Sequence, residues 1–124
     1  MGKKIIIVDD SRTARQQVAH ALAEGGYDVV EAVDGNDGLS KIAANPDAAL
    51  VIVDVNMPRM NGLEMLSAAK SGGPGGVPFL MLTTEAQPEL VQQAKALGAK
   101  GWIVKPFKPE LLRSAVSKLV GAGK

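Results

Sequence analysis

The sequence has no cysteine, few aromatic residues, no excess of charge of one sign and no long hydrophobic run. Without cysteine, disulfide bonds, thiolate metal sites and cysteine nucleophiles are excluded. Aromatic residues make up 3% of the chain, which argues against binding of nucleic acid by base stacking. The formal net charge of +1 also lacks the basic excess of modules that bind nucleic acid or membrane surfaces. We therefore expect neither a nucleic-acid nor a membrane partner.

The beginning of the chain does not have the pattern of a signal peptide. Residues 5–8 are apolar, but two acidic residues follow them directly. No later apolar run approaches the length of a transmembrane helix. The 124 residues are enough for one domain with a core, but not for two. The sequence thus predicts one cytoplasmic domain over residues 1–124, without a separate output domain.

Five short apolar runs recur along the chain at fairly even spacing. The runs at residues 5–8, 50–53 and 79–82 are apolar without alternation, which is typical of parallel strands covered on both faces. The other two lie at residues 27–30 and 102–104. Between the runs, apolar residues repeat at helical spacing, least clearly near residues 39–43. The last helical stripe consists of Leu111, Ala115, Val116 and Leu119.

Capping and helix-breaking residues agree with this alternation. Ser11 is suited to cap the first helix, and Gly25 and Gly26 to end it. Pro88 fits the first turn of the fourth helix, and Gly98 follows its end. Alternating strands and helices predict an α/β fold with a parallel sheet covered on both faces. Five strands in a chain of this size favour a flavodoxin-like doubly wound sheet, order 2-1-3-4-5, with five helices.

Polar residues follow four of the expected strands and would share one rim of the sheet. They are Asp9 and Asp10 after the first strand, Asp54 after the third, Thr83 and Thr84 at the end of the fourth, and Lys105 after the fifth. Ligands of doubly wound sheets bind at this rim. Three carboxylates that meet there repel one another and must bind protons or a cation. Oxygen ligands without histidine or cysteine favour Mg²⁺, and with a lysine and a hydroxyl the set suits phosphoryl transfer.

Four segments, "IIIVDDS", "VIVDVNMPRMNG", "MLTTEA" and "GWIVKPF", resemble the signature segments of response-regulator receiver domains, in particular those of the stand-alone chemotaxis type. The resemblance covers essentially the whole chain. It implies a phosphoryl-accepting response regulator of two-component signal transduction, which is a switch and not a turnover enzyme. The implied partners are a histidine kinase or its phosphotransfer domain and a downstream protein target. We expect a monomer.

The resemblance also assigns roles in phosphoryl transfer. It implies that Asp54 accepts the phosphoryl group, and that Asp10, Asp54 and the main-chain carbonyl of Asn56 bind Mg²⁺ directly. Asp9 would contribute mainly through water. The resemblance further implies that Lys105 pairs with Asp54 and then with the phosphoryl group, aimed inward by a cis peptide bond between Lys105 and Pro106.

A second group of residues would turn the phosphoryl group into a signal. By the same resemblance, Thr83 is the switch hydroxyl and Trp102 the switch aromatic, and partners bind the face of helix four, strand five and helix five. Trp102 stands where chemotaxis receivers usually have tyrosine, and its N–H needs a partner when buried. Asn56 and Glu85 would tune the lifetime of the phosphoryl group, and this pairing suggests a short-lived signal.

Other functions remain open at this point. A phosphate sink or a phosphorelay intermediate would use the same residues. A small Mg²⁺-dependent phosphatase with an aspartate nucleophile typically carries a second acid two residues further on, where this chain has Asn56. A flavodoxin-type protein would need a Ser-, Thr- or Gly-rich phosphate loop after the first strand, where Asp9 and Asp10 would repel the cofactor. Trp102 also has the simpler interpretation of a core residue of the fifth strand.

Overall fold

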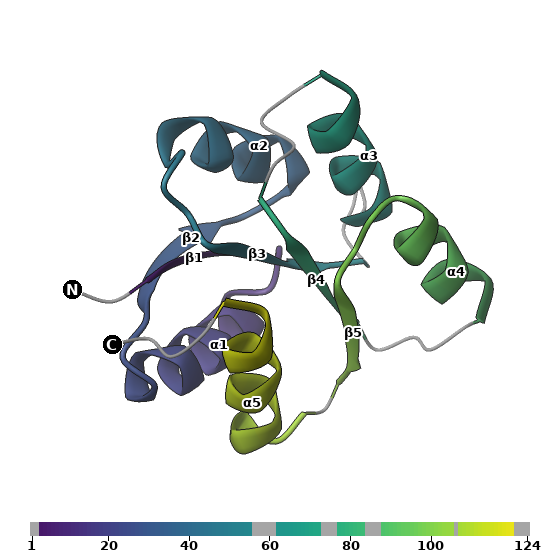
Figure 1. Ribbon diagram of the computed structural model, residues 1–124. Helices are drawn as coiled ribbons and strands as arrows, with labels where there is room; N and C mark the ends of the chain where they lie inside the picture. The colour runs from purple at the N-terminus through teal and green to yellow at the C-terminus, as the bar shows by residue number, and fades with distance from the viewer. Residues whose placement is uncertain (1–2, 56–61, 73–76, 84–87, 106, 121–124) are drawn as a thin grey trace.

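The computed structural model describes residues 3–55, 62–72, 77–83, 88–105 and 107–120, without the side chains of residues 70–72 and 83. Strands and helices alternate along the chain (Figure 1). The strands are β1 (Lys4–Val8), β2 (Asp28–Ala32), β3 (Leu50–Asp54), β4 (Phe79–Thr83) and β5 (Gly101–Val104). The helices are α1 (Arg12–Glu24), α2 (Gly35–Ala44), α3 (Gly62–Gly72), α4 (Pro88–Ala96) and α5 (Pro109–Val120).

The strands of the described chain form one parallel sheet with the order β2-β1-β3-β4-β5, which confirms the predicted fold class. β1 is flanked by β2 on one side and β3 on the other, so the strand order reverses at β1 and β3. Crevices in doubly wound sheets open at such a reversal, beyond the carboxyl ends of the strands. A ligand site is therefore expected beside the residues that end β1 and β3.

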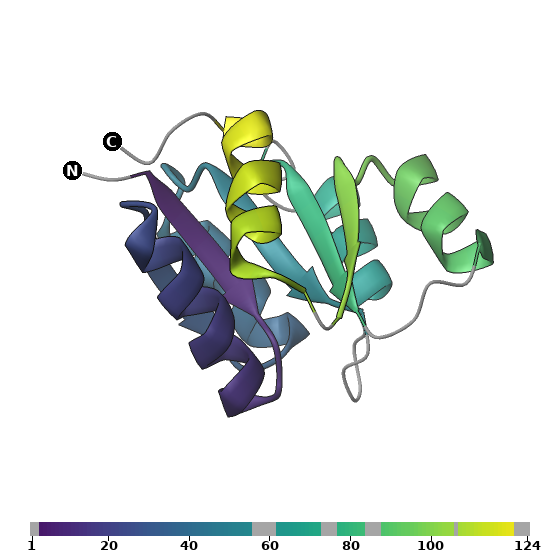
Figure 2. The same ribbon diagram turned by 90° about the horizontal axis from the view of Figure 1, so that it is seen from below.

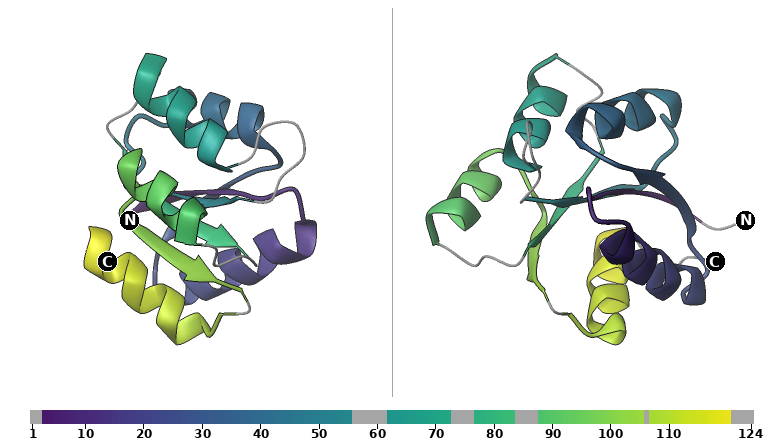
Figure 3. Two further views of the ribbon diagram at one scale, coloured as in Figure 1. Left: turned by 90° about the vertical axis from the view of Figure 1, so that its right-hand side faces the viewer. Right: turned by 180° about the vertical axis from the view of Figure 1, so that it is seen from behind.

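Helices cover both faces of the sheet. Figure 2 shows α1 and α5 side by side over one face, and Figure 3 shows α2 and α3 over the other. Side chains of the strands alternate between the two sides: Ile5 and Ile7 pack with α1 and α5, whereas Ile6 and Val8 pack on the side of α2, α3 and α4. Because both faces are buried, the strands contain continuous apolar runs instead of alternating ones.

Several element boundaries differ from the predicted ones. β2 begins at Asp28 and extends to Ala32, because its pairing with β1 continues to the end of that strand. β3 includes Asp54, which pairs with Leu82 of β4, whereas Lys105 lies just beyond β5 as predicted. The polar residues nevertheless remain at the carboxyl ends of the strands.

The buried face of α5 was predicted in part wrongly. Leu111 is 57% exposed, and Leu112 is buried in its place beside Val116. Both leucines are apolar, so composition does not tell which one lies on the buried side. The orientation of α5 against α1 and the sheet decides it.

The predicted helix ends are confirmed. The Ser11 side chain accepts a hydrogen bond from the N–H of Ala14, and Gly26 and Gly98 adopt positive φ angles just after α1 and α4. α4 begins at Pro88. Among the described residues, no helix is both long and apolar enough to cross a membrane.

Candidate functional site

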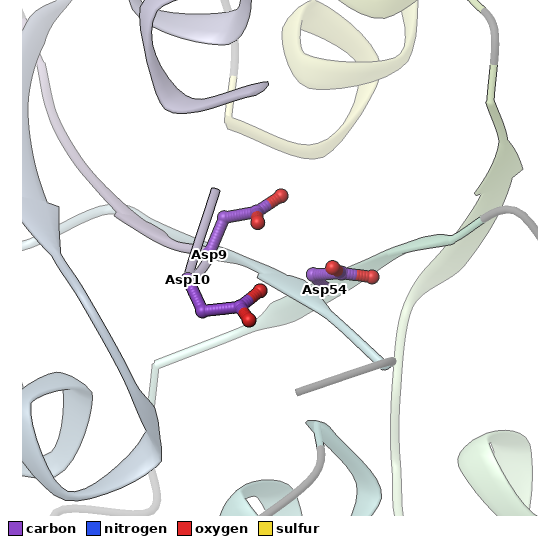
Figure 4. A group of neighbouring side chains, drawn as sticks. All are labelled: Asp9, Asp10 and Asp54. Atoms are coloured by element: carbon purple, nitrogen blue, oxygen red, sulfur yellow. The ribbon is translucent and has the colours of Figure 1, made fainter. Parts of the chain in front are cut away.

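Two neighbouring strands bring three aspartates together. Val8 of β1 pairs with Val53 of β3, so the next residues along each strand, Asp9 and Asp54, end up adjacent at the rim. Asp10 follows in the connection to α1. Figure 4 shows the side chains of Asp9 and Asp10 projecting toward the side on which Asp54 lies. The parallel register of β1 and β3 thus creates the acidic cluster that the strand-end residues predict.

The three carboxylates are close enough to share one ion. One carboxylate oxygen from each of Asp9, Asp10 and Asp54 lies within 4.8 Å of the other two. Asp9 and Asp54 are buried, whereas Asp10 is exposed. Negative charge held this closely at a partly dry rim requires compensation. The donor set is all oxygen and is open to solvent at Asp10, which fits a hard divalent cation with water in its shell.

The buried Asp9 carboxylate is held on both of its oxygens. The N–H of Ser11 donates to Oδ1 at 2.8 Å, and the ammonium of Lys105 donates to Oδ2 at 2.9 Å. No hydrogen bond or ion pair holds the Asp10 carboxylate in the described part of the chain. Asp9 is therefore committed to protein donors, while Asp10 is the carboxylate of this pair that is available to a ligand.

Lys105 supplies the positive charge within the site. Its ammonium lies 2.9 Å from Oδ2 of Asp9 and 3.6 Å from Oδ2 of Asp54, and its side chain is 17% exposed. The resemblance to receiver domains implied pairing with Asp54, and the structure adds a shorter contact to Asp9. The Lys105 ammonium therefore lies between the carboxylate of Asp9, just after β1, and that of Asp54 at the end of β3.

Gly62 allows α3 to approach the backbone of Asp54. A Cβ atom at this position would lie 2.7 Å from the carbonyl oxygen of Asp54 and 3.0 Å from the Cα atom of Val55. The N–H of Gly62 donates to the carbonyl of Val55 at 3.1 Å, which fixes the approach. The first residue of α3 is thus part of the support of Asp54.

Trp102 lies on β5, away from the carboxylates. It is partly buried and packs against the core on the side of α2, α3 and α4. Its indole Nε1 is buried and has no hydrogen-bond partner in the described structure. A cavity of about 50 Å³ lies beside the ring, lined by Val91, Ala94, Lys95, Ala99, Lys100 and Gly101. The N–H that the sequence predicts to need a partner is therefore unsatisfied in this conformation.

Several predicted site residues lie outside the described residues. These are Asn56, Thr84, Glu85 and Pro106, and with Pro106 the predicted cis bond to Lys105. Thr83 ends β4, so its main chain is at the expected rim, but its side chain is not described.

Sequence reasoning missed one residue beside the site. The side chain of Arg15 on α1 reaches back to the main-chain carbonyl of Asp9 at 2.7 Å and to Glu31 of β2 at 3.1 Å. No local pattern indicates this contact, because the arginine and its two partners belong to three different parts of the fold.

Known proteins share this fold and much of this sequence. Residues 5–117 match the response regulator receiver domain family. The chemotaxis protein CheY1 of Helicobacter pylori is 38% identical over 120 residues, which cover 95% of this chain and 97% of that protein. The solved structure of chemotaxis protein CheY4 of Vibrio cholerae has a TM-score of 0.89 and 42% identity, covering 96% and 99% of the two chains.

A third match is the CheX–CheY–BeF3–Mg²⁺ complex of Borrelia burgdorferi, with a TM-score of 0.88, 26% identity, and coverage of 94% of this chain and 87% of that one. The chain belongs to the response-regulator receiver domain family. It is homologous to the chemotaxis response regulators called CheY, a class of phosphoryl-accepting switches in two-component signalling. These matches do not favour the alternatives of a phosphate sink, a phosphorelay intermediate or a small Mg²⁺-dependent phosphatase.

Proposed function

We propose that Asp54 accepts a phosphoryl group from a histidine kinase or its phosphotransfer domain, in a cytoplasmic signalling pathway of the chemotaxis type. The observation that carries the proposal is the convergence of Asp9, Asp10 and Asp54 within 4.8 Å, with the Lys105 ammonium 2.9 and 3.6 Å from two of them. A carboxylate nucleophile beside a metal-binding set and a lysine has the parts that phosphoryl transfer needs.

The cluster is proposed to hold Mg²⁺. Asp10 and Asp54 would be direct ligands together with the main-chain carbonyl of Asn56, and Asp9 would act through water. The occupied oxygens of Asp9 support this division, as does the Asp10 carboxylate, which has no partner among the described residues. When bound, Mg²⁺ offsets the negative charge that develops on the transferred phosphoryl oxygens.

The transfer itself needs little from the protein beyond position and charge. An oxygen of Asp54 attacks phosphorus in line, a P–O bond forms, and the P–N bond to the histidine of the donor breaks. The imidazole leaves with the electron pair of that bond and binds a proton. Lys105 then contacts a phosphoryl oxygen instead of the Asp54 carboxylate. The product is an acyl phosphate on Asp54, so one phosphoryl group is transferred and the protein acts as a switch.

The signal is proposed to leave through the face of α4, β5 and α5, where a downstream protein target binds to the monomer. Thr83 would hydrogen-bond the phosphoryl group, and Trp102 would turn inward as the switch aromatic. The indole N–H, which has no partner among the described residues, and the cavity beside Trp102 support a side chain that has an alternative position. Asn56 and Glu85 would set the lifetime of the acyl phosphate. Persistence of the phosphorylated form over hours would contradict the short lifetime expected of this pair.

Intact mass after incubation with acetyl phosphate and Mg²⁺ tests the acceptor. We expect one added phosphoryl group in the wild type and none in Asp54→Asn. Asp28→Asn is a matched control, because Asp28 is an exposed aspartate at the opposite end of the sheet, and it should be phosphorylated like the wild type. An unmodified wild type, under conditions in which a known receiver domain reacts, would disprove the proposal. Modification of Asp54→Asn would show that another residue is the acceptor.

Tryptophan fluorescence tests the switch, since Trp102 is the single tryptophan of the chain. Addition of Mg²⁺ and beryllium fluoride, a mimic of the phosphoryl group, should change the emission of the wild type but not that of Asp54→Asn. An unchanged spectrum at saturating ligand would argue that Trp102 is a static core residue.

A further inference from the structure

Arg15 holds the piece of main chain that carries both Asp9 and Asp10. Its Nη1 donates to the carbonyl oxygen of Asp9 at 2.7 Å, and its Nε contacts the Glu31 carboxylate at 3.1 Å. The arginine side chain is 12% exposed and its bond to the Asp9 carbonyl is part-buried, whereas Glu31 is 45% exposed and the ion pair with it is open to solvent. A charged donor makes a shorter and stronger hydrogen bond to a carbonyl than a neutral donor does.

The Asp9 carbonyl belongs to the peptide unit that joins Asp9 to Asp10. A peptide unit is planar, so fixing its oxygen restricts the orientation of the plane that ends at the Cα atom of Asp10. The N–H of Asp9 is fixed as well, because it donates to the carbonyl of Ala32 at 3.2 Å. The main chain is thus held at two successive positions immediately before Asp10.

Asp10 depends on this support more than its neighbours do. The Asp9 carboxylate is held by Ser11 and Lys105, whereas no hydrogen bond holds that of Asp10 in the described structure. Among the described residues, the main chain is therefore what places the Asp10 side chain beside the cluster. Removal of the guanidinium would leave a carbonyl without its donor and free the turn that carries Asp10.

We propose that Arg15 is a positioning residue for the metal-binding carboxylates: it holds the Asp9–Asp10 peptide so that Asp10 meets Asp54 around one divalent cation. Glu31 on β2 holds the guanidinium from the other side. Because α1 provides the arginine and β2 the glutamate, the metal-binding geometry depends on the docking of two elements that contribute no carboxylate ligand. This inference rests on the proposed Mg²⁺ site.

The affinity for Mg²⁺, measured by isothermal titration calorimetry without any phosphoryl donor, tests the role directly. Loss of a residue that orients a metal ligand lowers metal affinity about 10- to 100-fold, and we expect a loss of about tenfold for Arg15→Ala. Arg15→Lys should lose less, because an ammonium keeps the charge but lacks the planar fork that contacts both partners. Arg15→Lys also provides the test if Arg15→Ala does not fold, as judged by circular dichroism.

Arg113→Ala is the matched control. Arg113 on α5 contacts the carbonyl of Ala21 at 3.3 Å and Glu24 at 3.5 Å, which is the same pair of groups in a place remote from the carboxylates. Its Mg²⁺ affinity should stay within about twofold of the wild type, since distant sites act independently. An equal loss in Arg113→Ala and Arg15→Ala would mean that general destabilisation, not positioning, explains the effect.

Phosphorylation by acetyl phosphate provides the second measurement. At limiting Mg²⁺ the rate of Arg15→Ala should fall in parallel with its affinity, and saturating Mg²⁺ should restore most of it. Unchanged affinity in a folded Arg15→Ala, or a rate loss that saturating Mg²⁺ does not restore, would overturn the inference. A wild type that does not bind Mg²⁺ would disprove the proposed metal site. A wild type and an Arg15→Ala protein that bind Mg²⁺ equally well would disprove only the role of Arg15.

Discussion

Replacement of Gly62 by alanine is the smallest change that should displace Asp54. The added Cβ would lie 2.7 Å from the carbonyl oxygen of Asp54, 3.1 Å from its carbonyl carbon and 3.0 Å from Cα of Val55. Ordinary contacts begin near 3.4 Å, so the first residue of α3 and the end of β3 must separate by about 0.7 Å. All three neighbouring atoms are main-chain atoms, so no side chain can rotate to make room.

The change in the free energy of unfolding expected for Gly62→Ala follows from two opposing effects. Alanine stabilises a helix interior by about 1 kcal/mol relative to glycine, but at the first residue of α3 much less of this gain applies. Overpacking of a close contact costs about 1–3 kcal/mol. We therefore expect Gly62→Ala to lower the free energy of unfolding by about 1–2 kcal/mol. A reacting group displaced by 1 Å can lose about 100-fold in rate, so a shift of this size at Asp54 should slow phosphorylation about tenfold or more.

Gly38→Ala is the control for this prediction. A Cβ at Gly38 on α2 would lie equally close to a neighbour, 2.6 Å from Cε of Met65, but that atom is the tip of a flexible side chain. It would also lie 2.9 Å from a methyl group of Val8, so some loss of stability is expected, without displacement of Asp54. Urea unfolding followed by circular dichroism measures stability, and intact mass over time measures phosphorylation by acetyl phosphate. A Gly62→Ala protein with wild-type stability and rate would refute the reasoning.

Three further predictions concern Lys105, Trp102 and Asp47. Lys105→Met removes the positive charge between the Asp9 and Asp54 carboxylates, so it should lower the free energy of unfolding in the absence of metal by about 1–3 kcal/mol. In thermal melts, added Mg²⁺ should raise the melting temperature of Lys105→Met more than that of the wild type. Equal increases in melting temperature would contradict this. Trp102→Phe removes an N–H that has no partner in the described structure, together with part of a ring that packs against the core, so its stability in urea should lie within about 1 kcal/mol of the wild type or above it. A loss beyond about 2 kcal/mol would contradict this expectation. The hydrogen bond from Lys4 lowers the pKa of the exposed Asp47 below its usual value, so the stability that this pair contributes is present at neutral pH and lost as the pH falls through the pKa of Asp47 in the folded protein. Acid titrations should therefore show a stability difference between the wild type and Asp47→Asn that disappears at low pH, and a difference that grows on acidification would contradict this sign.

The alternation of strands and helices could be predicted from the sequence, because it depends on local properties. Apolar runs, helical spacing and capping residues act within a few residues of one another, and Ser11 and Gly98 have the predicted local roles. The weakest helical pattern belongs to α2, and the structure shows why. Its buried face includes Gly35 and Gly38, which carry no apolar side chain and so leave no periodic signal.

The carboxylate cluster could also be predicted, since the carboxyl ends of parallel strands meet at one rim. Which contacts form within that rim could not. Lys105 lies closer to Asp9 than to Asp54, and this choice depends on the register of strands that are distant in the sequence. The burial of Leu112 in place of Leu111 likewise depends on how α5 is oriented on the sheet.

The sequence by itself determined the class of fold, the end of the sheet at which the polar side chains gather and the residue types available there. It did so because strand and helix periods are encoded locally and a parallel sheet has one carboxyl edge. Only the tertiary structure decided that Arg15 holds the Asp9 carbonyl and that the N–H of Trp102 is buried without a partner in the described structure. The Arg15 contacts arise where α1 packs beside β2, and the surroundings of Trp102 arise at the opposite edge of the sheet, where α4 lies beside β5. Both depend on side-chain packing between separate segments.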